Sequence, residues 1–307
     1  MLKLTRSQQA QLADLADATI CRTLAGEESV PAAANLFEAI GATVSAALPS
    51  VGDAWRSMLR PLGVRVNAIG AFSFGCPKVE LVDNGVPRRC DLATILAIVD
   101  DLTGPVPDRR ALLLGSRLRG AKEDPVQRRL FAEWPPFRLA DPIYRDSLRD
   151  MRSSGIQPAG CFAEIDLARR ESVWRLLAPT RTGRTRPRGT LGSALAAMAC
   201  GVGGGKATAR GLDDWSQTVH ELLNRSARAT MIGLSAQPEV RSATTYRGES
   251  GSGFVVFENR EGLPLESALA KAVSSGPALV EAPISVVHVV FRDVDGPDQP
   301  APGPTLQ

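Results

Sequence analysis

Two short stretches in the first half of the chain carry side chains that could hold a metal ion or a phosphate group. The first contains Asp91 and Thr94, and the second contains Gly115 and Arg117. Asp91 offers a carboxylate and Thr94 a neutral hydroxyl, which is a weak ligand for Mg²⁺. Arg117 stays protonated at all ordinary pH values, so its guanidinium can clamp a phosphate but cannot act as a base.

Both stretches lie in apolar segments that predict neighbouring strands. Residues 91–99 and 111–118 read as strands buried on both faces, joined by a turn segment that contains Gly104 and Pro105. With the turn centred near Pro105, an antiparallel register places Thr94 opposite Arg117 and Leu96 opposite Gly115. Gly115 and Arg117 are two residues apart and share a face. We therefore expect Asp91 or Thr94 to meet Gly115 and Arg117 at one end of a central sheet.

These two strands resemble a bacterial branch of the PD-(D/E)XK, or restriction-endonuclease-like, superfamily. The resemblance lies in CDLATILAIVDD at 90–101 and ALLLGSR at 111–117. The segments DPVQ at 124–127 and WPPF at 134–137 are similar to the D-P-x-Q and W-P-x-F segments of that branch. The resemblance covers residues 76–137 and implies an α/β fold with a mixed sheet flanked by helices.

The resemblance also implies a catalytic role for four positions, and this chain departs from the family at each of them. Asp91 stands where the family has Glu, Thr94 where it has the metal-binding Asp, Gly115 where it has Gln, and Arg117 where it has Lys. In the family these residues hold Mg²⁺ beside a phosphodiester and activate a water molecule. Asp91 alone keeps a carboxylate, so a working metal site needs another ligand. Glu80 on the preceding strand is the first choice, and Glu38, Asp83, Asp100 and Asp101 are further acids that the fold would have to bring in.

A dense group of arginines follows in the middle of the chain. Seven guanidiniums lie within twenty residues, at Arg169, Arg170, Arg175, Arg181, Arg184, Arg186 and Arg188. Forked guanidiniums match phosphate oxygens, so Arg181, Arg184, Arg186 and Arg188, together with Arg117, are candidate nucleic-acid contacts. The alternative is a solvated polar surface in a chain whose basic residues are mostly arginine.

Three other features are weaker candidates. The segment GVGGGKAT at 201–208 has the wrong spacing for a phosphate-binding loop and follows a predicted helix, so we expect a loop between helices. His288 lies in the apolar segment 285–291 and reads as a core histidine. Cys90 lies beside the candidate site, but no base for a thiolate nucleophile is evident.

The surrounding pattern divides the chain into four parts. Residues 1–60 predict helices at 6–24, 32–48 and 51–60, and residues 61–137 form the expected core, with strands from Val64 and at 78–82 and a helix at 123–133. Residues 138–292 predict an α+β extension, with helices at 141–153, 167–177, 189–199, 213–228 and 264–275 and strands at 160–165, 252–258 and 284–291. Residues 293–307 are rich in Pro and Gly and predict a disordered tail.

Composition excludes several classes of protein. The chain has 307 residues, a formal charge of +3 and 44% hydrophobic residues, as in an ordinary globular protein. No apolar run approaches the ~18–20 residues of a membrane span, and the first residues lack the apolar core of a leader peptide. Five scattered cysteines argue against a disulfide framework. We therefore expect a cytoplasmic protein with no membrane contact.

Three functions are compatible with these residues. The first is a degenerate PD-(D/E)XK-like protein in bacterial defence, which binds nucleic acid or a defence-system protein and cleaves little or nothing. The second is an active nuclease with substituted ligands, and the third is a structural or inhibitory subunit of a larger complex. No cofactor is expected for the first and third, whereas the second requires Mg²⁺.

Overall fold

The computed structural model describes eleven stretches of the chain, and the statements below concern these residues. They are 2–27, 32–73, 76–140, 147–152, 159–168, 173–208, 213–228, 230–231, 243–247, 253–258 and 284–294. The expected helix at 264–275 lies outside them, as do residues 295–307 of the expected tail.

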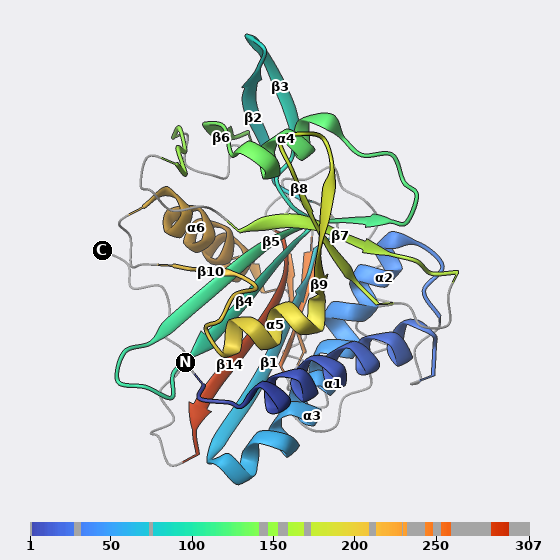
Figure 1. Cartoon of the computed structure of the whole chain (residues 1–307), viewed down its shortest axis with the longest axis vertical. Coiled ribbons are helices and arrows are strands. Elements are labelled where there is room, and N and C mark those ends of the chain that lie inside the picture. Colours follow the sequence, from blue (N-terminus) through green and yellow to red (C-terminus); the bar gives the residue numbers. More distant parts are fainter. Residues whose placement is uncertain are drawn as a thin grey trace.

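The chain folds as an α/β protein around one large mixed sheet (Figure 1). The helices are α1 (Arg6–Leu24), α2 (Leu36–Ala42), α3 (Leu48–Leu59), α4 (Pro125–Glu133), α5 (Leu191–Ala199) and α6 (Asp214–Arg228), with a π-helical segment η1 (Thr43–Ala47) and a 3-10 turn η2 (Arg60–Leu62). The strands are β1 (Val64–Phe72), β2 (Lys78–Asp83), β3 (Val86–Asp91), β4 (Ile95–Asp101), β5 (Asp108–Leu118), β6 (Phe137–Leu139), β7 (Gly160–Ile165), β8 (Arg175–Pro179), β9 (Thr185–Thr190), β10 (Lys206–Ala207), β11 (Thr230–Met231), β12 (Ala243–Arg247), β13 (Gly253–Glu258) and β14 (Ser285–Asp293).

The large sheet draws its strands from distant parts of the sequence. Its order is β11-β12-β13-β1-β14-β4-β5-β7-β8-β9, with β10 beside β5. Strand β14 lies between β1 and β4, antiparallel to the first and parallel to the second. The strands of the expected core and of the expected C-terminal extension therefore share one sheet. A second sheet, β3-β2-β6, carries the β2–β3 hairpin, which projects at the top of Figure 1.

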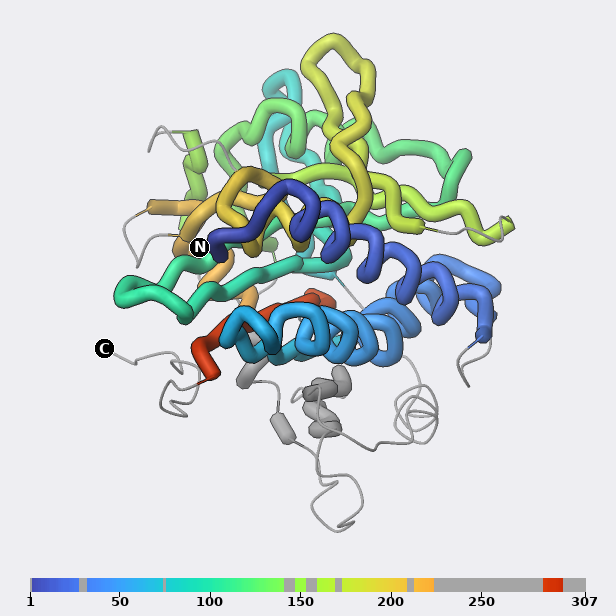
Figure 2. Tube along the Cα trace, turned by 60° about the horizontal axis from the view of Figure 1, so that its bottom comes forward, coloured from blue at the N-terminus to red at the C-terminus, as the bar shows by residue number. Residues whose placement is uncertain are grey.

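Helices cover both faces of the large sheet. Helix α3 packs on β1, α5 packs on β4, and α1 lies against both α3 and α5 (Figure 2). Gly160 of β7 faces Phe131 of α4, whereas the next residue, Cys161, lines a space beside α5. Because successive residues of a strand point to opposite faces, α4 and α5 lie on opposite sides of the sheet. The ring of Trp134, at the end of α4, contacts Trp215 of α6 and so places α6 on the side of α4.

Several sequence predictions match these elements closely. The helices expected at 6–24, 123–133, 189–199 and 213–228 correspond to α1, α4, α5 and α6, and the strand at 160–165 is β7. Caps explain two of the helix starts. Thr5 and Gln8 form a capping box at α1, and the Thr190 side chain accepts from the Ser193 amide at α5.

Other expectations were wrong. Residues 175–179 form strand β8 where a helix was expected at 167–177, and residues 147–152 contain an isolated bridge and a turn where a helix was expected at 141–153. Residues 36–59 form one unbroken helical run where two helices were expected at 32–48 and 51–60. The π-helical segment η1 lies directly before the turn that contains Pro49, which has no amide to donate within the run. Asp293 ends β14 and does not begin a tail.

None of the described helices is long and apolar enough to cross a membrane.

Helix segment η1 lies directly on β1 at Gly70. A Cβ atom built at Gly70 would stand 2.0 Å from the carbonyl oxygen of Val44 and 3.0 Å from a Val44 side-chain carbon. The absence of a side chain at Gly70 therefore sets the distance between the helical layer and the sheet.

We predict that Gly70→Ala destabilises the protein by about 1–3 kcal/mol, the usual cost of forcing an extra group into a packed interior. Urea unfolding should show a lower midpoint. Gly104→Ala is the control, because its new Cβ would meet nothing closer than 3.9 Å. Equal midpoints for the two variants would contradict this account of the β1–η1 contact.

Candidate functional site

The β4–β5 hairpin has a different register from the expected one. Ile95 pairs with Leu114 and Asp101 with Asp108, which brings Thr94 opposite Gly115. The expected pairing of Thr94 with Arg117 was therefore wrong by two residues, because the centre of the turn lies one residue closer to the N-terminus than expected. A slip of two residues keeps every side chain on its expected face. Gly115 and Arg117 thus share one face, the side covered by α4.

The Thr94 hydroxyl is fully engaged with the backbone of β5. Its Oγ1 donates to the carbonyl oxygen of Leu114 at 2.9 Å and accepts from the amide of Ser116 at 2.7 Å. The Thr94 amide also donates to the Leu114 carbonyl, at 2.8 Å. Thr94 therefore extends the β4–β5 ladder by one residue. Its oxygen serves this ladder and does not face an open ligand site.

Side chains of α4 occupy the space above Gly115. A Cβ atom at Gly115 would stand 3.1 Å from the Phe131 ring and 3.2 Å from Nε2 of Gln127. Gln127 Nε2 also donates to the backbone carbonyl of Asp91 at 3.0 Å. Gln127 therefore joins position 91 to position 115 and fills the volume that a side chain at 115 would need.

Arg117 lies in a network of four charges. Its guanidinium forms ion pairs with Glu123 and with Glu164, the latter at 3.3 Å, and Glu164 is its direct cross-strand neighbour on β7. Glu123 also pairs with Arg128 at 3.1 Å. The guanidinium carbon stands 4.7 Å from the centre of the Phe162 ring, which supports it from the sheet. Two carboxylates thus balance two guanidiniums, and the Arg117 side chain is only 16% exposed.

The two predicted carboxylates lie in the second sheet. Asp91 ends β3 and forms an ion pair with Lys78, directly opposite it on β2. Glu80, two residues further along β2, pairs with Arg89. The break at residues 92–94 separates Asp91 from β4, where the sequence had predicted one continuous strand from 91 to 99. Each carboxylate is therefore already neutralised by a basic side chain.

These residues do not fit a Mg²⁺ site. Mg²⁺ needs carboxylate or other oxygen ligands in near-octahedral geometry. Position 94 offers a hydroxyl bonded to the backbone, position 115 has no side chain, and position 117 carries a cation. Within the described ranges, no three His, Cys, Asp or Glu side chains group as they would around a metal.

Sequence reasoning missed the two carboxylates that hold Arg117. Glu164 is the one charged residue in the segment GCFAEI at 160–165, and a lone acid in an apolar strand is a usable signal for a buried partner. Glu123 lies in the loop before α4 and carries no comparable signal. The sequence resemblance assigns Gln127 no role beyond its place in the DPVQ segment.

The four arginines expected to contact nucleic acid lie together on the β8–β9 hairpin. Arg181 and Arg184 lie in its turn and Arg186 and Arg188 on β9, the last strand of the sheet path. All four are exposed, and none forms an ion pair with another described residue. Residues 173–190 contain five arginines and no acidic residue. Arg169 and Arg170 lie outside the described residues.

The turn that joins β8 to β9, and that carries Arg181 and Arg184, is fixed by hydrogen bonds. The Thr180 amide donates to the Arg184 carbonyl at 2.7 Å, and its hydroxyl donates to the same carbonyl at 2.9 Å. Gly183 has a φ of 81°, in the left-handed region that favours glycine. The hairpin thus holds its arginines on a hydrogen-bonded frame, whereas Arg117 is enclosed between carboxylates.

A hydrogen-bonded triad of polar side chains, centred on the buried Asp100, lies further along the same face as Arg117. His288 Nε2 is 2.9 Å from Oδ2 of Asp100, and Arg109 contacts both Asp100 oxygens at 2.6 and 2.7 Å. Burial raises the pKa of Asp100, but the hydrogen bonds and charges of Arg109 and His288 outweigh this and lower the pKa well below its usual range. His288 is buried as the sequence predicted, and it ties β14 to β4.

We predict that Arg117→Met destabilises the protein by about 2 kcal/mol, because Glu164 then loses its cation and Glu123 keeps only Arg128. Chemical denaturation at pH 7 measures the loss. Arg119→Met is the matched control, since the Arg119–Asp166 pair is more exposed and should contribute little. A loss no larger than that of the control would show that the network does not support the fold.

We predict that Asp100→Asn lowers the stability at pH 7 by about 3 kcal/mol, because Arg109 then loses its buried partner. The folded-state pKa of Asp100 is depressed, so its contribution is present above the ordinary pKa of about 4 and is lost as pH falls further. The gap between variant and wild type should therefore narrow below about pH 4. Asp53→Asn, at an exposed pair with Arg56, is the control. A gap that stays constant with pH would disprove the assignment.

Comparison with known proteins gives no relative. No protein-family model matches the sequence, no curated protein sequence is significantly similar to it, and no solved structure is significantly similar to its fold. The function is therefore inferred from the residues and geometry of this chain, together with the sequence resemblance described above.

Proposed function

We propose that this chain is a nucleic-acid-binding protein with a PD-(D/E)XK-like core that cleaves little or nothing. The observation that carries the proposal is the β8–β9 hairpin, where Arg181, Arg184, Arg186 and Arg188 are exposed on a segment without acids. Guanidiniums that have no internal carboxylate partner are available for phosphate oxygens. Such contacts give sequence-independent affinity that falls steeply with salt.

The geometry of the motif positions supports binding without cleavage. Metal-dependent hydrolysis of a phosphodiester needs at least one bound cation that activates water and stabilises the leaving oxygen. In this chain the cation at the motif position 117 is the guanidinium of Arg117, which forms ion pairs with Glu123 and Glu164. Thr94 and Gln127 are engaged with the backbone of β5 and of Asp91. Thr94 and Arg117 therefore serve to join neighbouring strands, and Gln127 joins α4 to the end of β3.

The restriction-endonuclease-like fold is part of this proposal. The β4–β5 hairpin, the face shared by positions 94, 115 and 117, and α4 packed over that face support it. A role in bacterial defence is implied by the sequence resemblance and rests on it. The partner that we propose is nucleic acid, and a defence-system protein is the alternative that the test below separates.

We predict that the protein binds nucleic acid with a steep salt dependence that the β8–β9 arginines create. Fluorescence anisotropy with labelled duplex DNA, single-stranded DNA and RNA of about 30 nucleotides, from about 50 to 300 mM KCl, gives the slope of log K against log salt. Each phosphate contact contributes about 0.9 to the magnitude of the slope on duplex DNA and about 0.7 on a single strand. Arg184→Gln combined with Arg186→Gln should lower the magnitude of this slope by the amount that about two phosphate contacts contribute.

The control is a second double variant, which has the same net charge as the first but replaces two arginines outside the hairpin. Arg6→Gln combined with Arg60→Gln changes exposed residues at the start of α1 and in η2. If both double variants weaken binding equally, the effect is one of overall charge and the hairpin is not the interface. If the wild-type protein binds no nucleic acid even at low salt, the protein-partner alternative replaces this proposal.

The same preparation tests for cleavage. Plasmid DNA, single-stranded DNA and RNA are incubated with Mg²⁺ or Mn²⁺, and we expect all three to stay intact. Cleavage that EDTA prevents and Asp91→Ala abolishes would overturn the second half of the proposal, because it would show that Asp91 leaves Lys78 to hold a metal.

A further inference from the structure

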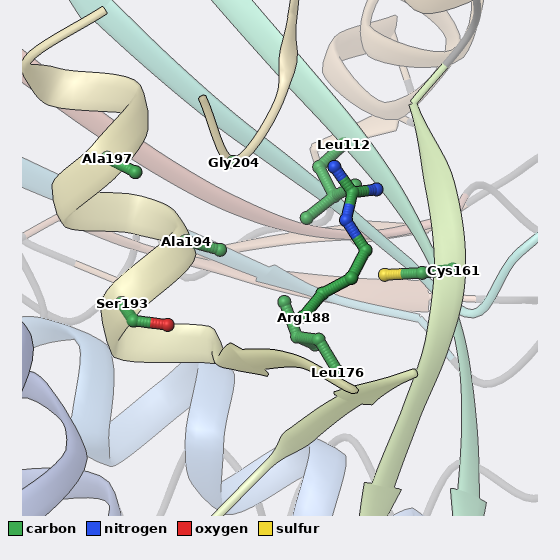
Figure 3. Close-up of a pocket in the computed structure, with 8 residues that line it drawn as sticks. All are labelled: Leu112, Cys161, Leu176, Arg188, Ser193, Ala194, Ala197 and Gly204. Atoms are coloured by element: carbon green, nitrogen blue, oxygen red, sulfur yellow. The ribbon is translucent and has the colours of Figure 1, made fainter. Parts of the chain in front are cut away.

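A small cavity lies between α5 and the sheet, on the face opposite α4. It has a volume of about 170 Å³. Its lining residues come from α5, from β5, β7, β8 and β9, and from the loop after α5, and they are Leu112, Cys161, Leu176, Arg188, Ser193, Ala194, Ala197 and Gly204 (Figure 3). Most of these side chains are apolar, so the cavity has an apolar wall and few polar groups.

The glycine-rich loop that follows α5 forms one side of this cavity. Gly204 has a φ of 77°, and a Cβ atom there would stand 2.3 Å from the carbonyl oxygen of Ala194. The loop therefore lies directly on α5 at a distance that only glycine permits. Ala194 and Ala197 are three residues apart on the helix and face the same space, and their short side chains leave it open. The loop thus forms part of the cavity wall through Gly204.

Arg188 brings the one formal positive charge to this cavity. Its side chain extends from β9 across the space towards Leu112 and Cys161 (Figure 3). No described residue forms an ion pair or a hydrogen bond with its guanidinium. The charge is therefore uncompensated within the described structure, and it stands at the solvent-exposed edge of an apolar wall.

The other polar groups in the cavity are neutral or already bonded. Burial raises the pKa of the Cys161 thiol to about 12, so it stays protonated and repels no anion. The Ser193 hydroxyl donates to the Thr190 carbonyl at 2.8 Å and accepts from the Thr190 amide at 2.8 Å. The cavity consequently offers a single cationic group and a compact apolar volume.

We propose that this cavity binds a small monoanion with a compact apolar body, a carboxylate of about the size of benzoate. The volume agrees with such a ligand, since an apolar cavity of ~150 Å³ takes up benzene. The carboxylate would pair with the Arg188 guanidinium, which is suited to a two-point contact with its oxygens. The apolar body would lie against Leu112, Leu176 and the two alanines of α5. This site does not depend on nucleic-acid binding.

Isothermal titration calorimetry with sodium benzoate tests the proposal on the full-length protein. A ligand of this size is expected to bind with a Kd of about 0.1–1 mM. Sodium acetate at the same ionic strength carries the charge without the apolar body, and benzyl alcohol carries the body without the charge. Both should bind at least about tenfold more weakly, because each lacks one of the two contacts.

Two variants and one matched control locate the binding. Arg188→Gln removes the charge and Ala197→Leu fills the cavity while keeping Arg188, and each should weaken benzoate binding at least about tenfold. Arg184→Gln changes an exposed arginine in the hairpin turn, outside the cavity, and should bind benzoate as the wild type does. Circular dichroism and thermal unfolding check that each variant is folded.

Three outcomes would overturn the proposal. These are no heat of binding with benzoate up to about 10 mM, undiminished binding by folded Arg188→Gln or Ala197→Leu, and equal affinity for acetate and benzoate. All of them are measured without nucleic acid, so a failure here is separate from a failure of the DNA and RNA experiments.

Discussion

Strand β14 (Ser285–Asp293) completes the centre of the large sheet, because it pairs with β1 on one side and with β4 on the other. These strands are more than 180 residues away from it in the sequence. The α4-side face of β14 carries His288, which contacts Asp100 of β4, and Asp100 in turn holds Arg109 of β5. Strands β14, β4 and β5 are therefore joined by backbone ladders and by a hydrogen-bonded triad centred on the buried Asp100. Pairing strands that are so far apart in the sequence is slow, so we expect the insertion of β14 between β1 and β4 to be a slow step in folding.

The same face shows how charge can be balanced within a protein. At one end, Asp100 is surrounded by two basic side chains, and at the other, Arg117 is surrounded by two acidic ones. Burying a charge is costly unless a partner of opposite sign lies within contact distance. A metal ion between carboxylates would be one way to satisfy this rule. In this chain the guanidinium of Arg117 provides the positive charge that Glu123 and Glu164 require.

The β8–β9 hairpin differs in that its arginines form no ion pair with any residue that the structure describes. It extends the sheet at β9 and also forms part of the wall of the cavity beside α5. Arg188 belongs to both regions, because its position on β9 is exposed and its side chain reaches over the cavity. One segment therefore connects the basic surface to the small apolar space. The glycine-rich loop contributes to this arrangement through close packing on α5.

The sequence by itself determined the local elements and the face on which the motif positions lie. Hydrophobic periodicity and capping residues are local, so α1, α4, α5 and α6 could be placed within a few residues, and alternation put Gly115 and Arg117 on one side of β5. The segment at 175–179 was misassigned as a helix, because only its pairing with β7 and β9 makes it a strand.

Only the tertiary structure decided which charges meet. The pairing of Arg117 with Glu164 depends on β7 lying beside β5, and the contact of His288 with Asp100 depends on β14 lying beside β4. Both pairings bring together segments distant in the sequence, and no local pattern encodes such a contact. The hairpin register was also decided in three dimensions, since the long connection expected between residues 99 and 111 allows several registers that keep the same faces buried. Side-chain chemistry can be read from the sequence, but its partners are set by the order of the strands.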